Sequence, residues 1–146
     1  MELLVEKVQG DRDQVLSYLA DILLQKGFVK EGYKESLLSR ERRFPTGLYV
    51  NDEVKVAIPH TEIAYANENV LVVAKPLNHL SFYRMDKPGD PIDVDVVFVL
   101  VVRDPRVYTK FLGKLTEKLT DSCFISLIKA GDLENLSAWI REVLAV

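Results

Sequence analysis

The sequence has few of the residues that build disulfide-bonded or metal-centred proteins, since its 146 residues include one cysteine and two histidines. A single cysteine cannot form an intrachain disulfide, and a zinc site made of Cys and His ligands would have too few members. We therefore expect no metal site. Cys123 precedes two large apolar residues, which predicts a buried and unreactive thiol.

The sequence also contains no long hydrophobic run and no long basic stretch. Its longest apolar run covers residues 96–102, well short of the roughly 20 residues that a membrane-spanning helix needs. Residues 1–7 lack the apolar stretch of a signal peptide. The net charge is -3, which gives no indication of nucleic-acid binding. We expect a cytoplasmic protein without direct membrane insertion.

The apolar pattern predicts one α/β domain over residues 1–146, a length sufficient to bury a core. Strand-like runs occupy residues 3–8, 48–50, 54–58, 70–74, 80–83 and 94–102, with 80–83 expected at a sheet edge and 94–102 in the centre. Helical spacing and capping residues predict helices near residues 14–26, 33–43, 105–119, 121–129 and 133–143. This alternation predicts a three-layer sandwich, a mixed central β-sheet flanked by helices.

His60 is the sharpest candidate for a functional residue. It follows the strand-like residues 54–58 and Pro59, which has no backbone donor and should end the strand. A histidine held at a strand end can present a neutral ring nitrogen as a nucleophile near neutral pH. Position and residue type alone leave a second interpretation open, in which His60 is a polar loop residue without a chemical role.

Three segments of the chain, in order, resemble the fructose/mannitol type of enzyme IIA domain of the bacterial phosphoenolpyruvate-dependent sugar phosphotransferase system. They are Arg-Glu-Arg-Arg-Phe-Pro-Thr-Gly at residues 40–47, Val-Ala-Ile-Pro-His at residues 56–60, and the apolar run 94–102 with the Asp-Pro turn and leucine-rich helix that follow it. The Phe-Pro-Thr-Gly form of the first segment is most similar to the galactitol-specific subtype. The likeness covers nearly the whole chain, and it implies the IIA fold with His60 as the phosphorylated residue.

The sequence departs from the family pattern just after the expected central strand. Many members carry a second active-site histidine near the start of the next helix, where this sequence has Tyr108. Galactitol-type members lack that histidine as well, so the departure agrees with the subtype. We expect Tyr108 to pack at the rim of the site and His79 to be a surface residue. The sequence does not decide whether either residue takes part in the chemistry.

The resemblance implies a phosphotransferase component that acts as a phosphoryl carrier. His60 would accept phosphate from phosphorylated HPr and pass it to a cysteine of enzyme IIB, with the membrane component IIC acting downstream on galactitol or another polyol or sugar. No cofactor is implied. Two alternatives stay open: a regulatory module that reports nitrogen or sugar status by phosphorylation-dependent protein binding, and a binding domain that kept the fold without the chemistry.

Arg40 is the residue we expect to stabilise the phosphate, because a guanidinium can bind phosphate oxygens bidentately. The hydroxyls of Thr46 and Thr61 are expected to complete the anion site. Other interpretations remain for two of these residues: Arg40 as a cation favoured by a helix end, and Thr46 as a turn residue. Glu41 is expected to offset the charge of the neighbouring arginines.

Overall fold

The computed structural model describes residues 1–143 and contains a mixed five-stranded β-sheet with the strand order β1-β4-β7-β3-β2. The strands are β1 (Glu2–Val8), β2 (Gly47–Tyr49), β3 (Lys55–Ala57), β4 (Val70–Pro76) and β7 (Val96–Val101). The β1–β4 and β3–β7 pairs are parallel, whereas the β4–β7 and β2–β3 pairs are antiparallel. The predicted mixed sheet is therefore confirmed.

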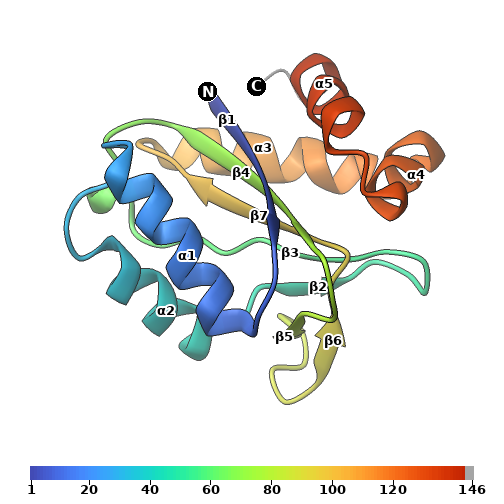
Figure 1. Cartoon of the computed structure of the whole chain (residues 1–146), viewed down its shortest axis with the longest axis horizontal. Coiled ribbons are helices and arrows are strands. Elements are labelled where there is room, and N and C mark those ends of the chain that lie inside the picture. The colour runs from blue at the N-terminus through green and yellow to red at the C-terminus, as the bar shows by residue number, and fades with distance from the viewer. Residues whose placement is uncertain (144–146) are drawn as a thin grey trace.

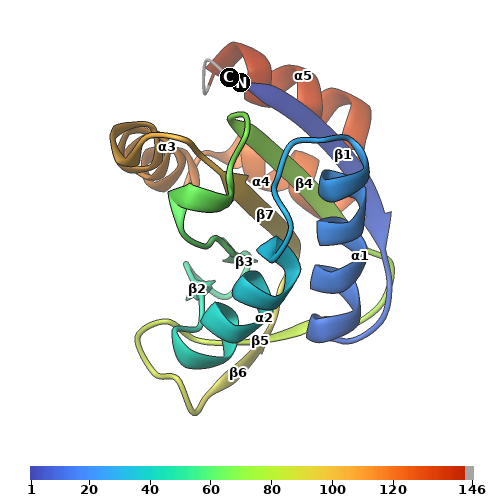
Figure 2. The ribbon, with the colours of Figure 1, turned by 90° about the vertical axis from the view of Figure 1, so that its left-hand side faces the viewer.

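In the described part of the chain, five α-helices cover the two faces of this sheet (Figures 1 and 2). Helices α1 (Arg12–Gln25) and α2 (Tyr33–Arg43) lie on one face, and α3 (Pro105–Lys118), α4 (Ser122–Ala130) and α5 (Leu133–Val143) lie on the other. The three-layer prediction is thus confirmed. Among the described residues, no helix has the length and apolar character that crossing a bilayer requires.

Strand β7 is the central strand of the sheet, and both of its faces are buried, as its continuous apolar run predicts. Because successive side chains of a strand point to opposite faces, the two cores receive alternate residues. Val97, Val99 and Val101 pack in the core beneath α1 and α2. The intervening residues of β7 pack in the core beneath α3, α4 and α5, where Phe98 contacts Phe124 at a ring-centroid distance of 6.3 Å.

Side chains that cap the helix starts fix where the chain leaves the sheet. Asp11 forms a capping box with Gln14 at the start of α1, with both reciprocal hydrogen bonds at 2.9 Å. Asp104 caps α3 by accepting the N–H of Arg106 at 2.9 Å, and Pro105 occupies the first turn. The second cap sets the start of the helix that carries Tyr108.

Two sequence expectations are wrong. Residues 80–83 are not an edge of the main sheet: β5 (Ser81–Tyr83) pairs with β6 (Pro91–Asp93) in a separate two-stranded sheet. Strand β6 escaped prediction because it has three residues and begins with proline, which is too little for a periodic signal. Cys123 is exposed rather than buried, because α4 turns Phe124 and Ile128 toward the core and Cys123 away from it.

Candidate functional site

The site lies where the carboxyl ends of the parallel strands β3 and β7 meet. In α/β sheets this edge is where ligands bind, because loops from neighbouring strands converge there. His60 follows β3 through Pro59, whose carbonyl accepts the N–H of Leu100 in β7 at 3.0 Å. Tyr108 follows β7 in the first turn of α3. The sheet therefore brings together two residues that are 48 positions apart in the sequence.

The ring of His60 is held in one orientation by its own strand. Its Nδ1 atom lies 2.9 Å from the carbonyl oxygen of Ile58. Because a carbonyl only accepts hydrogen bonds, Nδ1 carries the proton and donates it, which leaves the lone pair on Nε2. Burial lowers the pKa of the half-buried imidazole, the bond to Ile58 partly opposes this, and the charge of Arg40 lowers the pKa further. These effects favour the neutral ring, in which Nε2 is a hydrogen-bond acceptor.

Tyr108 contacts His60 directly. Its hydroxyl oxygen lies 3.1 Å from Nε2 and 3.4 Å from Nδ1, and the two ring centroids are 4.6 Å apart with the planes tilted by 48°. Burial raises the pKa of the Tyr108 phenol, while the charge of Arg40 lowers it in part. The protonated hydroxyl is thus a donor to Nε2. Tyr108 packs against the ring as expected, and it also makes a polar contact that the sequence did not reveal.

Arg40 supplies the positive charge of the site from the last turn of α2. Its positive charge lowers the pKa of both His60 and Tyr108. The guanidinium carbon of Arg40 lies 5.2 Å from the ring centroid of Phe44, which is 54% exposed. Arg40 and Thr61 line the same small pocket, of about 90 Å³. The pocket therefore combines a permanent cation with a hydroxyl.

Ser36 is a site residue that the sequence reasoning missed. Its hydroxyl and that of Thr61 share a hydrogen bond, and Ser36 lines the pocket with Arg40. Its spacing from Arg40 could have identified it, because residues four apart in a helix lie on the same face. Ser36 and Arg40 have that spacing in α2. The bond between the two hydroxyls ties the loop after His60 to α2.

Thr46 is placed differently from the expectation that it contacts phosphate. It is 3% exposed, its hydroxyl donates to Oε1 of Glu41 at 2.7 Å, and its N–H donates to Oε2 at 2.8 Å. Both donors of Thr46 therefore hold Glu41, so Thr46 serves the loop after α2 and not the pocket. Glu41 is 2% exposed and accepts both of these bonds in the interior, and the arginine whose charge acts on it is Arg12 of α1.

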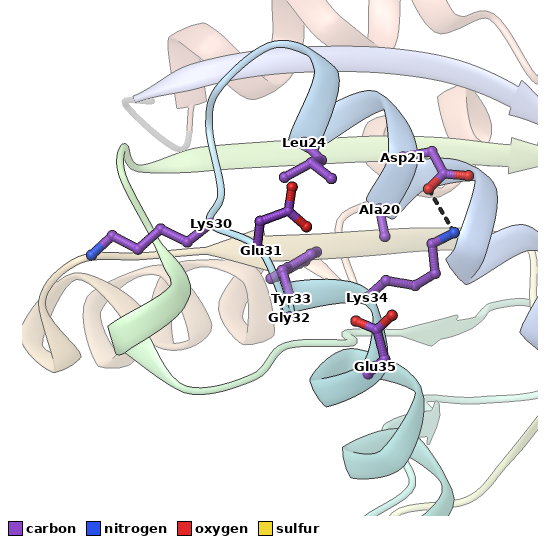
Figure 3. A pocket seen from close by; sticks show the side chains of 9 residues that line it. All are labelled: Ala20, Asp21, Leu24, Lys30, Glu31, Gly32, Tyr33, Lys34 and Glu35. Carbon is purple, nitrogen blue, oxygen red and sulfur yellow. Dashed lines mark ion pairs between the residues drawn. The ribbon is translucent and has the colours of Figure 1, made fainter.

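His79 and the pocket of Figure 3 lie outside the site. The side chain of His79 is 92% exposed and its Nδ1 contacts a carboxylate oxygen of Asp93 at 3.0 Å, which confirms the surface position. The pocket of Figure 3, about 220 Å³, lies between α1 and the start of α2, and it contains the ion pair of Lys34 with Asp21 at 2.6 Å. His60 is not among the residues that line it. Within residues 1–143 no group of three acidic, Cys or His residues is arranged to hold a metal ion.

The sequence and the fold both match known proteins. Residues 3–143 match the family model described as "Phosphoenolpyruvate-dependent sugar phosphotransferase system, EIIA 2". The galactitol-specific EIIA component of Escherichia coli K12 is 33% identical over 109 residues, which cover 75% of this chain and 71% of that protein. The fructose-like EIIA component of the same strain is 25% identical over 133 residues, which cover 90% of this chain and 86% of that protein.

Solved structures of enzyme IIA share the fold. The mannitol enzyme IIA of Escherichia coli, determined in complex with phosphorylated enzyme IIB, superposes with a TM-score of 0.66 at 16% identity and covers 94% of both chains. The crystal structure of mannitol IIA from that organism gives a TM-score of 0.65 at 15% identity, over 92% of this chain and 94% of the other. From its sequence match over residues 3–143, the chain belongs to the EIIA 2 family of the phosphoenolpyruvate-dependent sugar phosphotransferase system.

Proposed function

We propose that Nε2 of His60 accepts a phosphoryl group from phosphorylated HPr and passes it to a cysteine of enzyme IIB. The observation that carries this proposal is the state of the ring: a neutral imidazole with Nδ1 bonded to a carbonyl and the lone pair on Nε2. As phosphorus bonds to Nε2, its bond to the donor nitrogen breaks. The proton stays on Nδ1, hydrogen-bonded to the Ile58 carbonyl, and the P–N bond that forms can transfer its phosphoryl group again.

The surrounding residues have defined roles in this transfer. Phosphoryl transfer depends mainly on positioning and on charge stabilisation. Arg40 meets the phosphoryl oxygens with its guanidinium, and the Thr61 hydroxyl, oriented by Ser36, contributes a further hydrogen bond in the pocket that they share. Tyr108 gives up its bond to Nε2 when the phosphoryl group arrives and then donates to a phosphoryl oxygen, since its hydroxyl already lies at this nitrogen.

The similar proteins support a proposal for the transported compound and for the protein that accepts the phosphoryl group. The galactitol-specific component is 33% identical to this chain, which supports galactitol or a related polyol as the compound transported by the complete system. The solved complex of mannitol IIA with phosphorylated IIB supports a IIB protein as the acceptor. In this proposal residues 1–146 form one IIA domain in the cytoplasm, and the membrane component IIC acts after IIB.

The test combines phosphoenolpyruvate, enzyme I, HPr and this protein, followed by intact mass measurement and mapping of the modified residue. The expected product carries one acid-labile phosphate on His60. His60→Ala should abolish the modification. His79→Ala is the matched control, because it removes the only other histidine, which is exposed and paired with Asp93. Transfer to a galactitol-type IIB is then measured by loss of the phosphate. A folded wild-type protein that takes no phosphate would overturn the proposal.

A further inference from the structure

Glu41 is a buried carboxyl that the proposed mechanism does not use. It lies in the last turn of α2, next to Arg40, and it is 2% exposed. Both hydrogen-bond donors of Thr46 are directed at it, the N–H at 2.8 Å and the hydroxyl at 2.7 Å. A carboxylate is disfavoured by burial and by the negative end of a helix dipole. Burial and the helix dipole therefore both cost free energy at this position, and the two hydrogen bonds from Thr46 offset part of that cost.

The hydrogen bonds continue from Thr46 to the ring of His60. The carbonyl of Thr46 accepts the N–H of Ile58 at 3.3 Å, one step beyond the last registered pair of β2 and β3, Gly47 with Ala57. The carbonyl of Ile58 in turn accepts Nδ1–H of His60 at 2.9 Å. A continuous series of hydrogen bonds therefore runs from α2 to the ring nitrogen that is not the nucleophile.

We propose that Glu41 is a positioning residue for phosphoryl transfer, which acts through Thr46 and Ile58 to keep the proton of His60 on Nδ1. This inference rests on the proposed function. Without an acceptor for its N–H and hydroxyl, Thr46 can shift, the bond to Ile58 weakens, and the Ile58 carbonyl loses its fixed direction. An imidazole whose Nδ1 has no acceptor can carry its proton on Nε2, and a protonated Nε2 cannot attack phosphorus.

The chemistry of Glu41 determines which substitutions test this role. A carboxylate accepts both bonds from Thr46, whereas a carboxylic acid accepts the N–H and donates to the hydroxyl oxygen. A glutamine side chain can make the second arrangement, because its oxygen accepts and its NH₂ donates. Methionine has a similar length and offers neither strong acceptor nor donor. Glu41→Gln should therefore preserve the series of bonds, and Glu41→Met should break it.

The experiment measures the tautomer and the transfer rate in the same proteins. The ¹⁵N chemical shifts of the His60 ring report which nitrogen carries the proton, and phosphorylation by enzyme I and HPr gives the initial rate. For Glu41→Met we expect proton population to move from Nδ1 to Nε2 and the rate to fall about tenfold, the equivalent of one buried hydrogen bond. Glu41→Gln should stay close to wild type. Glu35→Met, on the exposed first turn of the same helix, is the control.

Each outcome supports or overturns the inference. A folded Glu41→Met protein with an unchanged His60 spectrum and an unchanged rate would overturn it. If Glu41→Met does not fold, Thr46→Val decides, because valine has the shape of threonine and removes only the bond from the hydroxyl; it should shift the tautomer and the rate in the same direction. If wild type takes no phosphate, the proposed function fails, while the ring spectra still test the tautomer.

Discussion

The hydroxyl of Tyr108 lies 3.1 Å from Nε2 of His60, the nitrogen that we propose attacks phosphorus. Because Nδ1 donates to the Ile58 carbonyl, Nε2 can only accept, so Tyr108 is the donor in this contact. The phenol therefore covers the nucleophile in the free protein. In the proposed mechanism the same hydroxyl donates to a phosphoryl oxygen after phosphorylation, and this charge-assisted hydrogen bond is stronger than the bond it replaces.

Tyr108→Phe should shorten the lifetime of the phosphorylated protein. The substitution keeps the ring that packs against His60 and removes only the hydroxyl donor. We expect hydrolysis of the phosphohistidine to accelerate about tenfold, which corresponds to the loss of one hydrogen bond to a charged group. The measurement is the decay of phosphorylated mass at neutral pH. Tyr18→Phe, on an exposed tyrosine of α1, is the control, and equal decay rates in the two variants would contradict the role given to Tyr108.

Arg40 and Arg43 offer a matched comparison of two arginines at the end of one helix. Both guanidinium carbons lie near the Phe44 ring, at 5.2 and 5.4 Å from its centroid, but only Arg40 lowers the pKa of His60. Arg40→Gln should reduce the initial rate of phosphorylation about a hundredfold, a typical cost of removing one group that stabilises transition-state charge. Arg43 also lines the pocket but its charge does not act on the His60 ring, so Arg43→Gln should reduce the rate much less. Similar losses in the two variants would assign the effect to the general charge of the helix end.

The imidazole of His60 should titrate below the ordinary histidine value of 6.5, because burial and the charge of Arg40 lower its pKa. The midpoint is measured from the ring resonances by NMR between pH 4 and pH 8. Arg40→Gln should raise the midpoint toward the ordinary value, since one of the two lowering effects is removed. A midpoint above 6.5 in the wild type would show that the ring is more accessible or more strongly paired with an acidic group than this structure describes.

Glu41 should make stability depend on pH in the direction opposite to most carboxylates. Burial raises its pKa from 4.5 to about 7, although the bonds from Thr46 and the charge of Arg12 oppose part of the shift. Between these values the folded protein holds a proton that the unfolded chain has lost, so the free energy of unfolding falls as pH rises. The stabilising contribution is complete below about pH 4.5 and is lost above about pH 7.

Denaturant unfolding of wild type and Glu41→Gln at pH 5 and pH 8 measures this effect. The stability of the wild type relative to the variant should be greater at pH 5 than at pH 8 by about 2 to 3 kcal/mol, which is most of the equivalent of the pKa shift. The comparison between the two proteins cancels the titration of the other groups. Glu35→Gln should show no such pH-dependent difference from wild type. A constant difference between wild type and Glu41→Gln would mean that Glu41 is ionised at both pH values.

The positions of the helices and strands could be predicted because their signals are local. The helices predicted at residues 33–43 and 105–119 correspond closely to α2 and α3, and the apolar run predicted as a strand at 94–102 contains the central strand β7. The failures have physical reasons. Strand β6 is three residues long and begins with proline, and the exposed face of α4 carries Cys123 because a helix beside a sheet buries only one of its sides.

The candidate site was only partly accessible from the sequence. His60 and Arg40 stand out through their position at element ends and through a family motif, and the structure places the charge of Arg40 close enough to lower the pKa of His60. The hydroxyl of Thr46 appeared suitable for phosphate until the structure showed it bonded to Glu41. Residue type indicates which hydrogen bonds a side chain can make, but it does not indicate which partner takes them.

The sequence by itself determined the order of the elements other than β6, the buried central strand and the histidine that follows β3, because each depends on residues that are near neighbours in the chain. Only the tertiary structure decided that the Tyr108 hydroxyl meets His60 across 48 positions and that Ser36 meets Thr61 across 25. It also decided the tautomer of His60, through a carbonyl whose direction depends on the pairing of β3 with its neighbours. Such contacts follow from how sheets and helices pack, and local residue patterns do not specify that packing.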